Sequence, residues 1–217
     1  MYQPPHFQET RLEVLHELIR AHPLGLLVCN SEDGPVANPL PFLLDADAAP
    51  KGVLRAHLSR ANPQWQAIRA QAEIPVLVVF QGVDTYVTPS WYETKRQTGK
   101  VVPTWNYAMV QARGRAVIRE DPAWLGQQIA ALTNAHEAPR AEPWHVSDAP
   151  DAFIAGQMKG IVGIEIEIAE LNGKWKVSQN RPAEDRAGVA EGLAAADDHI
   201  SKTMAELVAG YGSRDKR

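Results

Sequence analysis

The segment Arg55–Pro63 (RAHLSRANP) gathers groups that could hold a phosphate ester. An apolar run with the pattern of a strand delivers His57, Ser59 and Arg60 into a turn, and Pro63 suits the first turn of a short helix. A planar guanidinium and unpaired amides at a helix start are donors that phosphate accepts. A helix cap beside a surface arginine would show the same pattern, so two interpretations stay open on the residues alone.

Two aromatic segments could hold a flat ligand. Tyr86–Tyr92 (YVTPSWY) combines three aromatic rings with two hydroxyls, a composition favoured in ligand walls and at interfaces. In the segment KVVPTWNY, Trp105 and Asn106 offer a stacking face beside an amide, and an isoalloxazine ring needs both an apolar sandwich and hydrogen bonds to its pyrimidine edge. Packing of these rings in the core of a hairpin end is the alternative for both segments.

Several kinds of chemistry have no support in the sequence. The seven histidines form no cluster with cysteine and no His-Glu-x-x-His motif, so no metal site is expected. The chain also lacks a phosphate-loop motif, a glycine-rich dinucleotide motif and a Gly-x-Ser-x-Gly elbow. Its single cysteine, Cys29, lies in an apolar run and is expected to be a small buried core residue. We therefore name no catalytic residue.

The composition is that of a globular chain without a basic surface. The 217 residues are 45% hydrophobic and 22% charged, and the formal net charge is −4. A chain of this length can bury a sizeable core, whereas the basic balance typical of a duplex-binding protein is missing. The N-terminal segment has no signal-peptide pattern and no apolar stretch is long enough to span a bilayer, which predicts a cytoplasmic protein.

The periodicity predicts an antiparallel barrel decorated with helices. Short apolar or alternating runs predict strands, with hairpin turns at Gln81-Gly82 and Asn172-Gly173. Two prolines at alternate positions, Pro39 and Pro41, indicate an edge strand. Since strands that are neighbours in sequence are joined by turns, the expected fold class is α+β, a closed or nearly closed and mainly antiparallel barrel. A last helical stripe is predicted over Val189, Leu193, Ile200, Met204, Leu207 and Tyr211.

Five motifs, in this order along the chain, resemble the PaiB-like family of FMN-binding negative transcriptional regulators. They are Met1-Tyr2-x-Pro4-x-x-Phe7, His57-x-x-Arg60-Ala61-Asn62-Pro63, Tyr86-Val87-x-Pro89-Ser90-Trp91-Tyr92, Lys100-Val101-Val102-Pro103-Thr104-Trp105-Asn106-Tyr107 and Ser178-Gln179-Asn180-Arg181. The resemblance implies an FMN-binding split barrel in a bacterial homodimer with the flavin at the subunit interface. The sequence pattern changes after Arg181-Pro182, which predicts one domain over residues 1–182 and a helical extension over residues 183–217 that packs on the barrel or on the partner.

The resemblance also implies roles for nine residues that bind FMN. The turn holding the flavin phosphate would contain His57, Ser59 and Arg60, and Asn62 would shape that turn together with Pro63. A strand with Asn38, Pro39 and Leu40 would lie beside the flavin. Trp105 and Asn106 would line the flavin from the partner subunit.

Transcriptional repression is the function that the resemblance implies, and two alternatives stay open. One is a flavin-dependent oxidoreductase of the pyridoxamine-phosphate oxidase or flavin reductase kind, and the other is a carrier of flavin or haem. DNA binding is implied by the family but is unsupported by charge. The predicted helix at 121–136 has no lysine or arginine, and the last helical region carries Asp197-Asp198. An ordinary helix-turn-helix, whose flanks neutralise phosphates, is therefore not expected.

Overall fold

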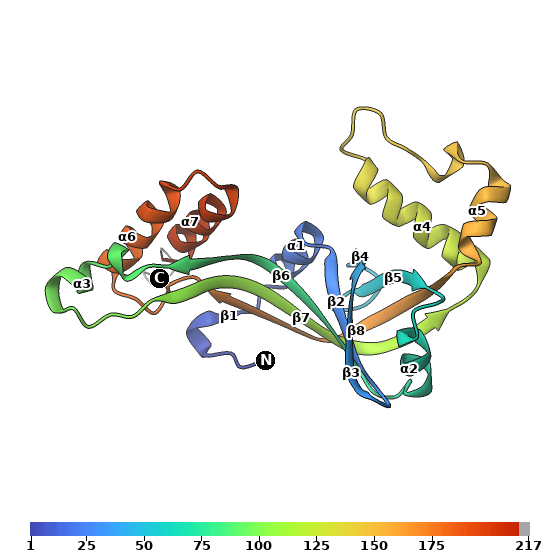
Figure 1. Cartoon of the computed structure of the whole chain (residues 1–217), viewed down its shortest axis with the longest axis horizontal. Helices are drawn as coiled ribbons and strands as arrows, with labels where there is room; N and C mark the ends of the chain where they lie inside the picture. Colours follow the sequence, from blue (N-terminus) through green and yellow to red (C-terminus); the bar gives the residue numbers. More distant parts are fainter. Residues whose placement is uncertain (213–217) are drawn as a thin grey trace. The chain divides into compact units, whose positions relative to one another are not determined.

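The computed structural model describes residues 1–212, which form an antiparallel sheet of eight strands with seven α-helices and three short 3-10 helices (Figure 1). The strands are β1 (Gln8–Glu9), β2 (Leu24–Ser31), β3 (Gly34–Pro41), β4 (Leu43–Asp45), β5 (Val53–Ser59), β6 (Val76–Val87), β7 (Thr104–Arg119) and β8 (Ile161–Lys176). The α-helices are α1 (Leu12–Ala21), α2 (Gln64–Ala70), α3 (Glu93–Thr98), α4 (Pro122–Glu137), α5 (Asp151–Met158), α6 (Ala183–Ala194) and α7 (His199–Gly212). None of the helices in the described range is long and apolar enough to cross a membrane.

The order of the strands in the sheet is β3-β2-β6-β7-β8-β5-β4, and β1 adds to β8. The two ends of this path nearly meet, because only Phe42 separates β3 from β4 and because β3 also lies against β5. Phe42 is buried and packs edge-to-face on Phe80, with 5.7 Å between the ring centroids. This confirms the predicted α+β fold, a mainly antiparallel split barrel with peripheral helices.

The chain divides into two compact units, which we call the barrel unit and the ribbon unit. The barrel unit comprises residues 16–80 and 111–171, and its core contains Leu27, Leu54, Val78, Ile164 and Ile166, none of which is exposed. The ribbon unit comprises residues 1–15 and 81–110 and the chain from residue 172 onward. Strands β6, β7 and β8 each contribute residues to both units.

In the ribbon unit, α6 and α7 cover one face of the strands. Trp175 of β8 is buried on that face and stacks on Tyr211 of α7, with 6.5 Å between the ring centroids and 18° between the ring planes. Val189, Leu193 and Met204 of the predicted helical stripe are buried, as expected for an amphipathic helix, whereas Ile200 is about half exposed. The stripe belongs to two helices rather than one, and Asp198 caps the second through the amide of Ser201. Residues 213–217 of the expected C-terminal extension lie outside the described residues.

The two predicted hairpin turns are wrong, because β6 and β8 are single continuous strands through Gln81-Gly82 and Asn172-Gly173. A two-residue hairpin of this kind needs positive φ, and neither Gly82 nor Gly173 has it. Gly173 serves close packing instead. A Cβ at this position would lie 2.1 Å from the Leu15 Cδ2 atom and 3.0 Å from the Glu9 carbonyl oxygen, so only glycine lets α1 and β1 approach the strand.

A buried carboxylate ties the N-terminal segment of the ribbon unit to its last helix. Glu9 is only 5% exposed, and its carboxylate accepts hydrogen bonds from the Arg11 guanidinium, from the Tyr211 hydroxyl and from the amides of Thr10 and Arg11. Burial acts to raise the pKa of Glu9, but hydrogen bonds from Arg11 and Tyr211 outweigh it and hold the pKa at about 2. The carboxylate is therefore ionised and satisfied in the folded state.

We predict that Glu9→Gln lowers the free energy of unfolding by about 2 kcal/mol at pH 7, since a buried charge-assisted network is lost. The pKa of Glu9 is lower in the folded chain than its ordinary value of 4.5. The stabilisation is thus complete above that value and disappears as the pH falls toward 2. Urea unfolding at pH 7 and at pH 3 measures this, with Glu17→Gln on the exposed side of α1 as the control. A gap between Glu9→Gln and the parent that is as large at pH 3 as at pH 7 would contradict the assignment.

Candidate functional site

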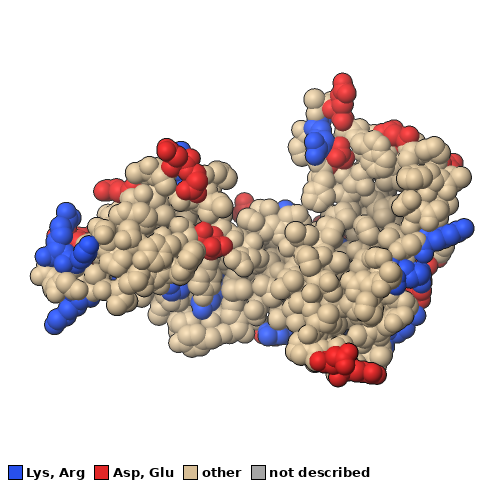
Figure 2. All heavy atoms as spheres, viewed as in Figure 1, with Lys and Arg blue, Asp and Glu red and all other residues tan. Residues whose placement is uncertain are grey.

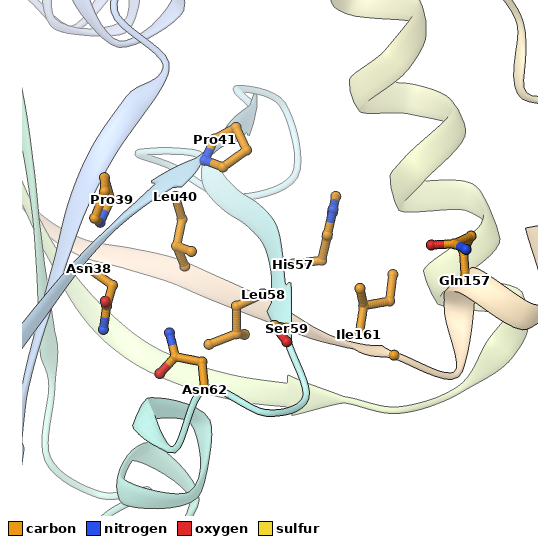
Figure 3. Close-up of a pocket in the computed structure, with 11 residues that line it drawn as sticks. Asn38, Pro39, Leu40, Pro41, His57, Leu58, Ser59, Asn62, Gln157 and Ile161 are labelled. Atoms are coloured by element: carbon orange, nitrogen blue, oxygen red, sulfur yellow. The ribbon is translucent and has the colours of Figure 1, made fainter.

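The candidate site is an open hollow of roughly 470 Å³ in the barrel unit (Figure 3). This volume lies within the range of small-molecule and cofactor sites. The hollow is formed by the end of β3, the end of β5, the turn into α2 and the segment that joins α5 to β8. Its lining residues are Asn38, Pro39, Leu40, Pro41, His57, Leu58, Ser59, Asn62, Gln157, Gly160 and Ile161.

Pairing of β5 with β8 brings the two sides of the hollow together. The register places His57 opposite Gly163 and Ser59 opposite Ile161. The backbone contact continues past the end of β5, because the Arg60 amide donates to the Gly160 carbonyl at 2.8 Å. The start of β8 therefore forms a wall beside the turn into α2.

Strand β3 borders the hollow with an edge that has no amide donor at positions 39 and 41. It lies at one end of the sheet path and pairs only with β2, so the predicted edge strand is confirmed. The Phe42 amide donates to the Pro23 carbonyl on the β2 side, and alternation along the strand then turns positions 39 and 41 to the free edge. Both positions are proline, which has no N–H. At these positions the edge beside the hollow thus offers only carbonyl oxygens, which accept hydrogen bonds. Because the amide donors are missing, a further strand cannot pair regularly with this edge.

The amides of the turn after β5 are already in use, which corrects the expectation of unpaired amides there. The Ala61 amide donates to the Ser59 hydroxyl oxygen at 3.2 Å, and the Asn62 amide donates to the Ser59 carbonyl at 2.9 Å. The Gln64 amide donates to the Asn62 side-chain oxygen at 3.0 Å. The turn is satisfied by its own short side chains, as Ser and Asn commonly do before a helix. Donors to a ligand must therefore come from side chains.

Three side chains of the hollow have donor capacity left. Ser59 accepts a bond from Ala61 but keeps its hydroxyl hydrogen, and Asn62 accepts through its oxygen but keeps its NH₂ group. The Nδ1 atom of His57 is buried and has no hydrogen-bond partner among the described residues. Burial lowers the pKa of His57 below its ordinary value of 6.5, so the imidazole is neutral at pH 7 and offers one N–H.

The burial of His57 has a visible cause. Gly163, which lies opposite His57 on β8, has no side chain. The ring of Trp124 occupies the place where a side chain would lie, 2.2 Å from an ideal Cβ. Trp124 is held at the start of α4 by the Asp121 carboxylate, which accepts its amide at 2.8 Å. The tryptophan ring therefore excludes water from the side of β8 where the histidine lies.

Arg60 is not one of the lining residues, and its side chain braces the turn beside the hollow. Its Nε and Nη2 donate to the carbonyls of Lys159 and Ile161, both at 3.2 Å, and its Nη1 donates to Glu120 at 2.6 Å. Glu120 is shared with Arg69, and these two guanidinium groups lower the pKa of Glu120. The Arg60 side chain is about 40% exposed and keeps one N–H on each terminal nitrogen.

Gln64 fixes the strand edge to the turn. Its side chain is 1% exposed and donates to the Leu27 carbonyl at 2.9 Å, while its oxygen accepts the Asn38 NH₂ group at 3.0 Å. Figure 3 shows the side chains of Asn38 and Asn62 directed towards one another at one end of the hollow. One buried amide thus sets the position of Asn38, although the sequence did not single out Gln64.

The structure brings together six of the nine predicted binding residues around the hollow, namely Asn38, Pro39, Leu40, His57, Ser59 and Asn62. Arg60 lies in the adjoining turn. Trp105 and Asn106 belong to the ribbon unit and do not line the hollow. Asn106 is buried and bonds to the Ser178 hydroxyl at 3.0 Å, whereas Trp105 is 55% exposed and packs edge-to-face on Tyr86. The roles of all nine residues toward a ligand stay predictions.

Sequence reasoning missed the residues on the far wall, Gln157, Gly160 and Ile161. They lie at the end of α5, in the segment that follows it and at the start of β8, 98 to 102 residues after Ser59. Only the register between β5 and β8 places them at the site, and no local pattern carries that information.

The fold is a mainly antiparallel split barrel with an open hollow in the barrel unit. The chain belongs to the FMN-binding domain family, whose family model, described as "Putative FMN-binding domain", matches residues 1–170. The match runs through both the barrel unit and the ribbon unit.

Relatives over the full chain occur in fungi and bacteria. An uncharacterized protein of Emericella nidulans is 38% identical over 251 residues and is matched along 100% of both chains. A Bacillus subtilis protein named protease synthase and sporulation protein PAI 2 is 30% identical over 208 residues, which covers 96% of each chain. The latter match confirms the resemblance to the PaiB-like family.

Two solved structures have a similar fold. A conserved hypothetical protein from Mycobacterium tuberculosis superposes with a TM-score of 0.57 at 15% identity, over 84% of this chain and 94% of the other. A protein from Mycobacterium smegmatis described as binding FAD and haem superposes with a TM-score of 0.54 at 19% identity, over 78% of this chain and 73% of the other. At these identities the likeness establishes the fold.

We predict that Gln64→Met destabilises the chain by about 2 kcal/mol, because the Leu27 carbonyl and the Asn38 amide lose their buried partner while the side-chain volume is kept. Urea unfolding measures the change, and Gln66→Met on the exposed side of α2 serves as the control. Equal stability of the two variants would show that Gln64 is not the anchor of this turn.

Proposed function

We propose that the chain binds FMN, with the flavin phosphate in the hollow of the barrel unit. The observation that carries this proposal is the set of three side-chain donors, His57, Ser59 and Asn62, around one open hollow that no carboxylate lines. A phosphate accepts several hydrogen bonds and favours cationic and neutral donors. The neutral His57 imidazole with a buried, unpartnered nitrogen fits such a group, because the bond would satisfy an atom that otherwise carries a desolvation cost.

Arg60 supplies the charge in this proposal. Arg60 and Arg69 share a single carboxylate, Glu120, so the three side chains together carry one excess positive charge. A phosphate near Ser59 would meet this excess charge without displacing Glu120. Arg60 would then bind the ligand and brace the turn at the same time.

The free edge of β3 supports a place for the isoalloxazine ring. The ring carries an N–H on its pyrimidine edge, and the carbonyl-only edge at Pro39 and Pro41 supplies acceptors. Leu40, Pro41 and Ile161 add apolar surface on the walls of the hollow. This combination of an apolar wall with a few directed polar groups is typical of cofactor sites.

We further propose a homodimer in which the partner subunit completes the flavin site through Trp105. Tyr86 and Trp105 of the ribbon unit are 47% and 55% exposed and pack edge-to-face, and large exposed apolar side chains that lie together usually mark an interface. Asn106 then acts indirectly, since its bond to Ser178 fixes the strand that carries Trp105. Residues 1–182 would form the FMN-binding domain and residues 183–217 its helical extension.

The regulatory role of the PaiB-like type is part of the proposal, supported by the Bacillus subtilis relative. Direct reading of DNA by a recognition helix is not part of it. Helix α4 contains no lysine or arginine, and α7 contains only Lys202. On the face shown in Figure 2, basic side chains are scattered in small groups beside acidic ones.

The absorption spectrum of the freshly purified protein tests the central proposal, since oxidised-flavin bands support it and a Soret band would instead indicate a haem carrier.

We predict that Arg60→Ala weakens FMN binding by about 2–4 kcal/mol, because a charge-assisted contact to the phosphate is removed. A fluorescence titration with FMN measures the dissociation constant. Arg69→Ala is the matched control, because Arg69 shares Glu120 with Arg60 but does not contact the turn carbonyls. If the two variants bind FMN equally, the loss comes from the Glu120 pair and Arg60 is no phosphate ligand.

We predict that Trp105→Ala and Asn62→Ala, each of which weakens FMN binding alone, regain one normal site per dimer when they are mixed and allowed to exchange subunits. One subunit then supplies an intact hollow and the other an intact Trp105. Stoichiometric FMN titration of the mixture and light scattering measure this. A monomer that holds FMN tightly, or a mixture without recovered sites, would exclude a shared site.

A further inference from the structure

The ribbon unit carries a second group of residues that the proposed flavin phosphate site does not use. Along β8, side chains alternate between the two faces of the strands, so Gly173 and Trp175 face the helices while Lys174 and Lys176 face away from them. Contacts between rings and ammonium groups place Tyr86, Trp105 and Tyr107 on the same side as the lysines. We call these five side chains the aromatic–cationic face.

Three cationic side chains of the ribbon unit, Lys174, Lys176 and Arg181, have no ion-pair partner among the described residues. Lys174 is only 8% exposed, and its Nζ lies between the rings of Tyr2 and Tyr107, at 5.5 Å and 5.4 Å from their centroids. Lys176 lies 6.0 Å from the Tyr107 centroid, and Arg181 lies 4.7 Å over the Tyr92 ring. None of the three forms an ion pair within residues 1–212, whereas Arg11, Arg55, Arg60 and Arg119 each have a carboxylate partner.

The two buried carboxylates among the described residues of the ribbon unit, Glu9 and Asp185, form no ion pair with these cations. Glu9 pairs opposite Gly173, which puts it on the helix-covered face with Arg11 and Tyr211. Asp185 is 1% exposed, its Oδ1 accepts the Thr94 amide at 2.8 Å to start α3, and its Oδ2 has no hydrogen-bond partner among the described residues. Neither neutralises the lysines of the aromatic–cationic face.

The clustering has an electrostatic cost that an anion would relieve. Burial is the main cause that lowers the pKa of Lys176, and the charges of Lys174 and Arg181 lower it further. Lys176 donates to the Thr104 hydroxyl and to the Trp105 carbonyl, so its ammonium group is held beside Trp105 with one N–H left. Like charges placed together in a partly buried site are a physical mark of a binding site.

We propose that Lys176 and Arg181 bind the anionic group of a planar aromatic molecule, a carboxylate or a phosphate, whose ring stacks beside Trp105 and Tyr107. Exposed aromatic faces provide the stacking surface, and the two cations provide charge-assisted bonds at its border. Lys174 stays structural, since its ammonium group is enclosed by two tyrosine rings. One part of this proposal rests on the proposed function: the second ligand lies next to the flavin only if Trp105 also lines the flavin site.

The test is calorimetric titration of the full chain, saturated with FMN so that the hollow is filled, with phenyl phosphate and with benzoate. Inorganic phosphate is the probe that lacks the ring, and benzyl alcohol is the probe that lacks the charge. We expect saturable binding of at least one aromatic anion, weakened about tenfold in Lys176→Gln and in Arg181→Gln, in line with loss of one charge-assisted bond. Trp105→Leu should reduce that affinity to the level of inorganic phosphate, and Lys202→Gln on α7 should leave it unchanged. The aromatic anion that binds more tightly shows whether the site prefers a phosphate or a carboxylate.

Two outcomes would overturn the proposal. One is the absence of saturable binding of both aromatic anions, and the other is parent-like affinity in both Lys176→Gln and Arg181→Gln. If FMN itself does not bind, the same titrations are run on the flavin-free chain and on Asn62→Ala. Binding that is lost in Asn62→Ala but kept in Lys176→Gln would place the anion in the hollow and overturn the proposal. Binding that is kept in Asn62→Ala but lost in Lys176→Gln would support the aromatic–cationic face even though the flavin proposal fails.

Discussion

The antiparallel register between β5 and β8 is the constraint on which the candidate site depends. It sets Ser59 against Ile161 and His57 against Gly163, so the end of one strand and the beginning of a distant one share a wall. Arg60 continues this pairing with its own amide and with its guanidinium, which holds two carbonyls of the facing segment. A slip of one residue would turn His57 and Ser59 to the opposite face and bring Leu58 in their place. The apolar core of β5 and β8, with Leu54, Ile164 and Ile166 fully buried, makes such a slip costly.

Charge is distributed so that the hollow keeps its polar groups uncommitted. Arg55, Glu165, Arg119 and Asp45 form a connected set of ion pairs further along β5 and β8. Burial acts to raise the pKa of Glu165, but bonds from Arg119 and Arg55 outweigh it and lower that pKa. These carboxylates therefore have partners of their own and leave His57 neutral. Because no carboxylate lines the hollow, an incoming anion would meet hydrogen-bond donors there.

The sequence predicted the parts of the site that are local in the chain and missed those that depend on pairing. The turn with His57, Ser59 and Asn62 and the proline-rich edge strand were found because each has a short-range signature. The amides of that turn were expected to be unpaired, yet Ser59 and Asn62 occupy them, since short polar side chains before a helix bond to the nearest backbone. Asn172-Gly173 has the composition of a hairpin turn, but the glycine is needed for contact with Leu15 and Glu9, and that contact is invisible in sequence. Gln64 was overlooked because a buried glutamine in a helix has no distinguishing pattern.

The continuity of β6, β7 and β8 through both units makes the molecule indivisible. The chain passes between the barrel unit and the ribbon unit at residues 15/16, 80/81, 110/111 and 171/172, and three of these four crossings lie within or at the end of a regular strand segment rather than in a linker. Neither unit can be excised, transplanted or permuted without cutting strands that the other needs for its own core. A cut between the two units would therefore break strands that both units share.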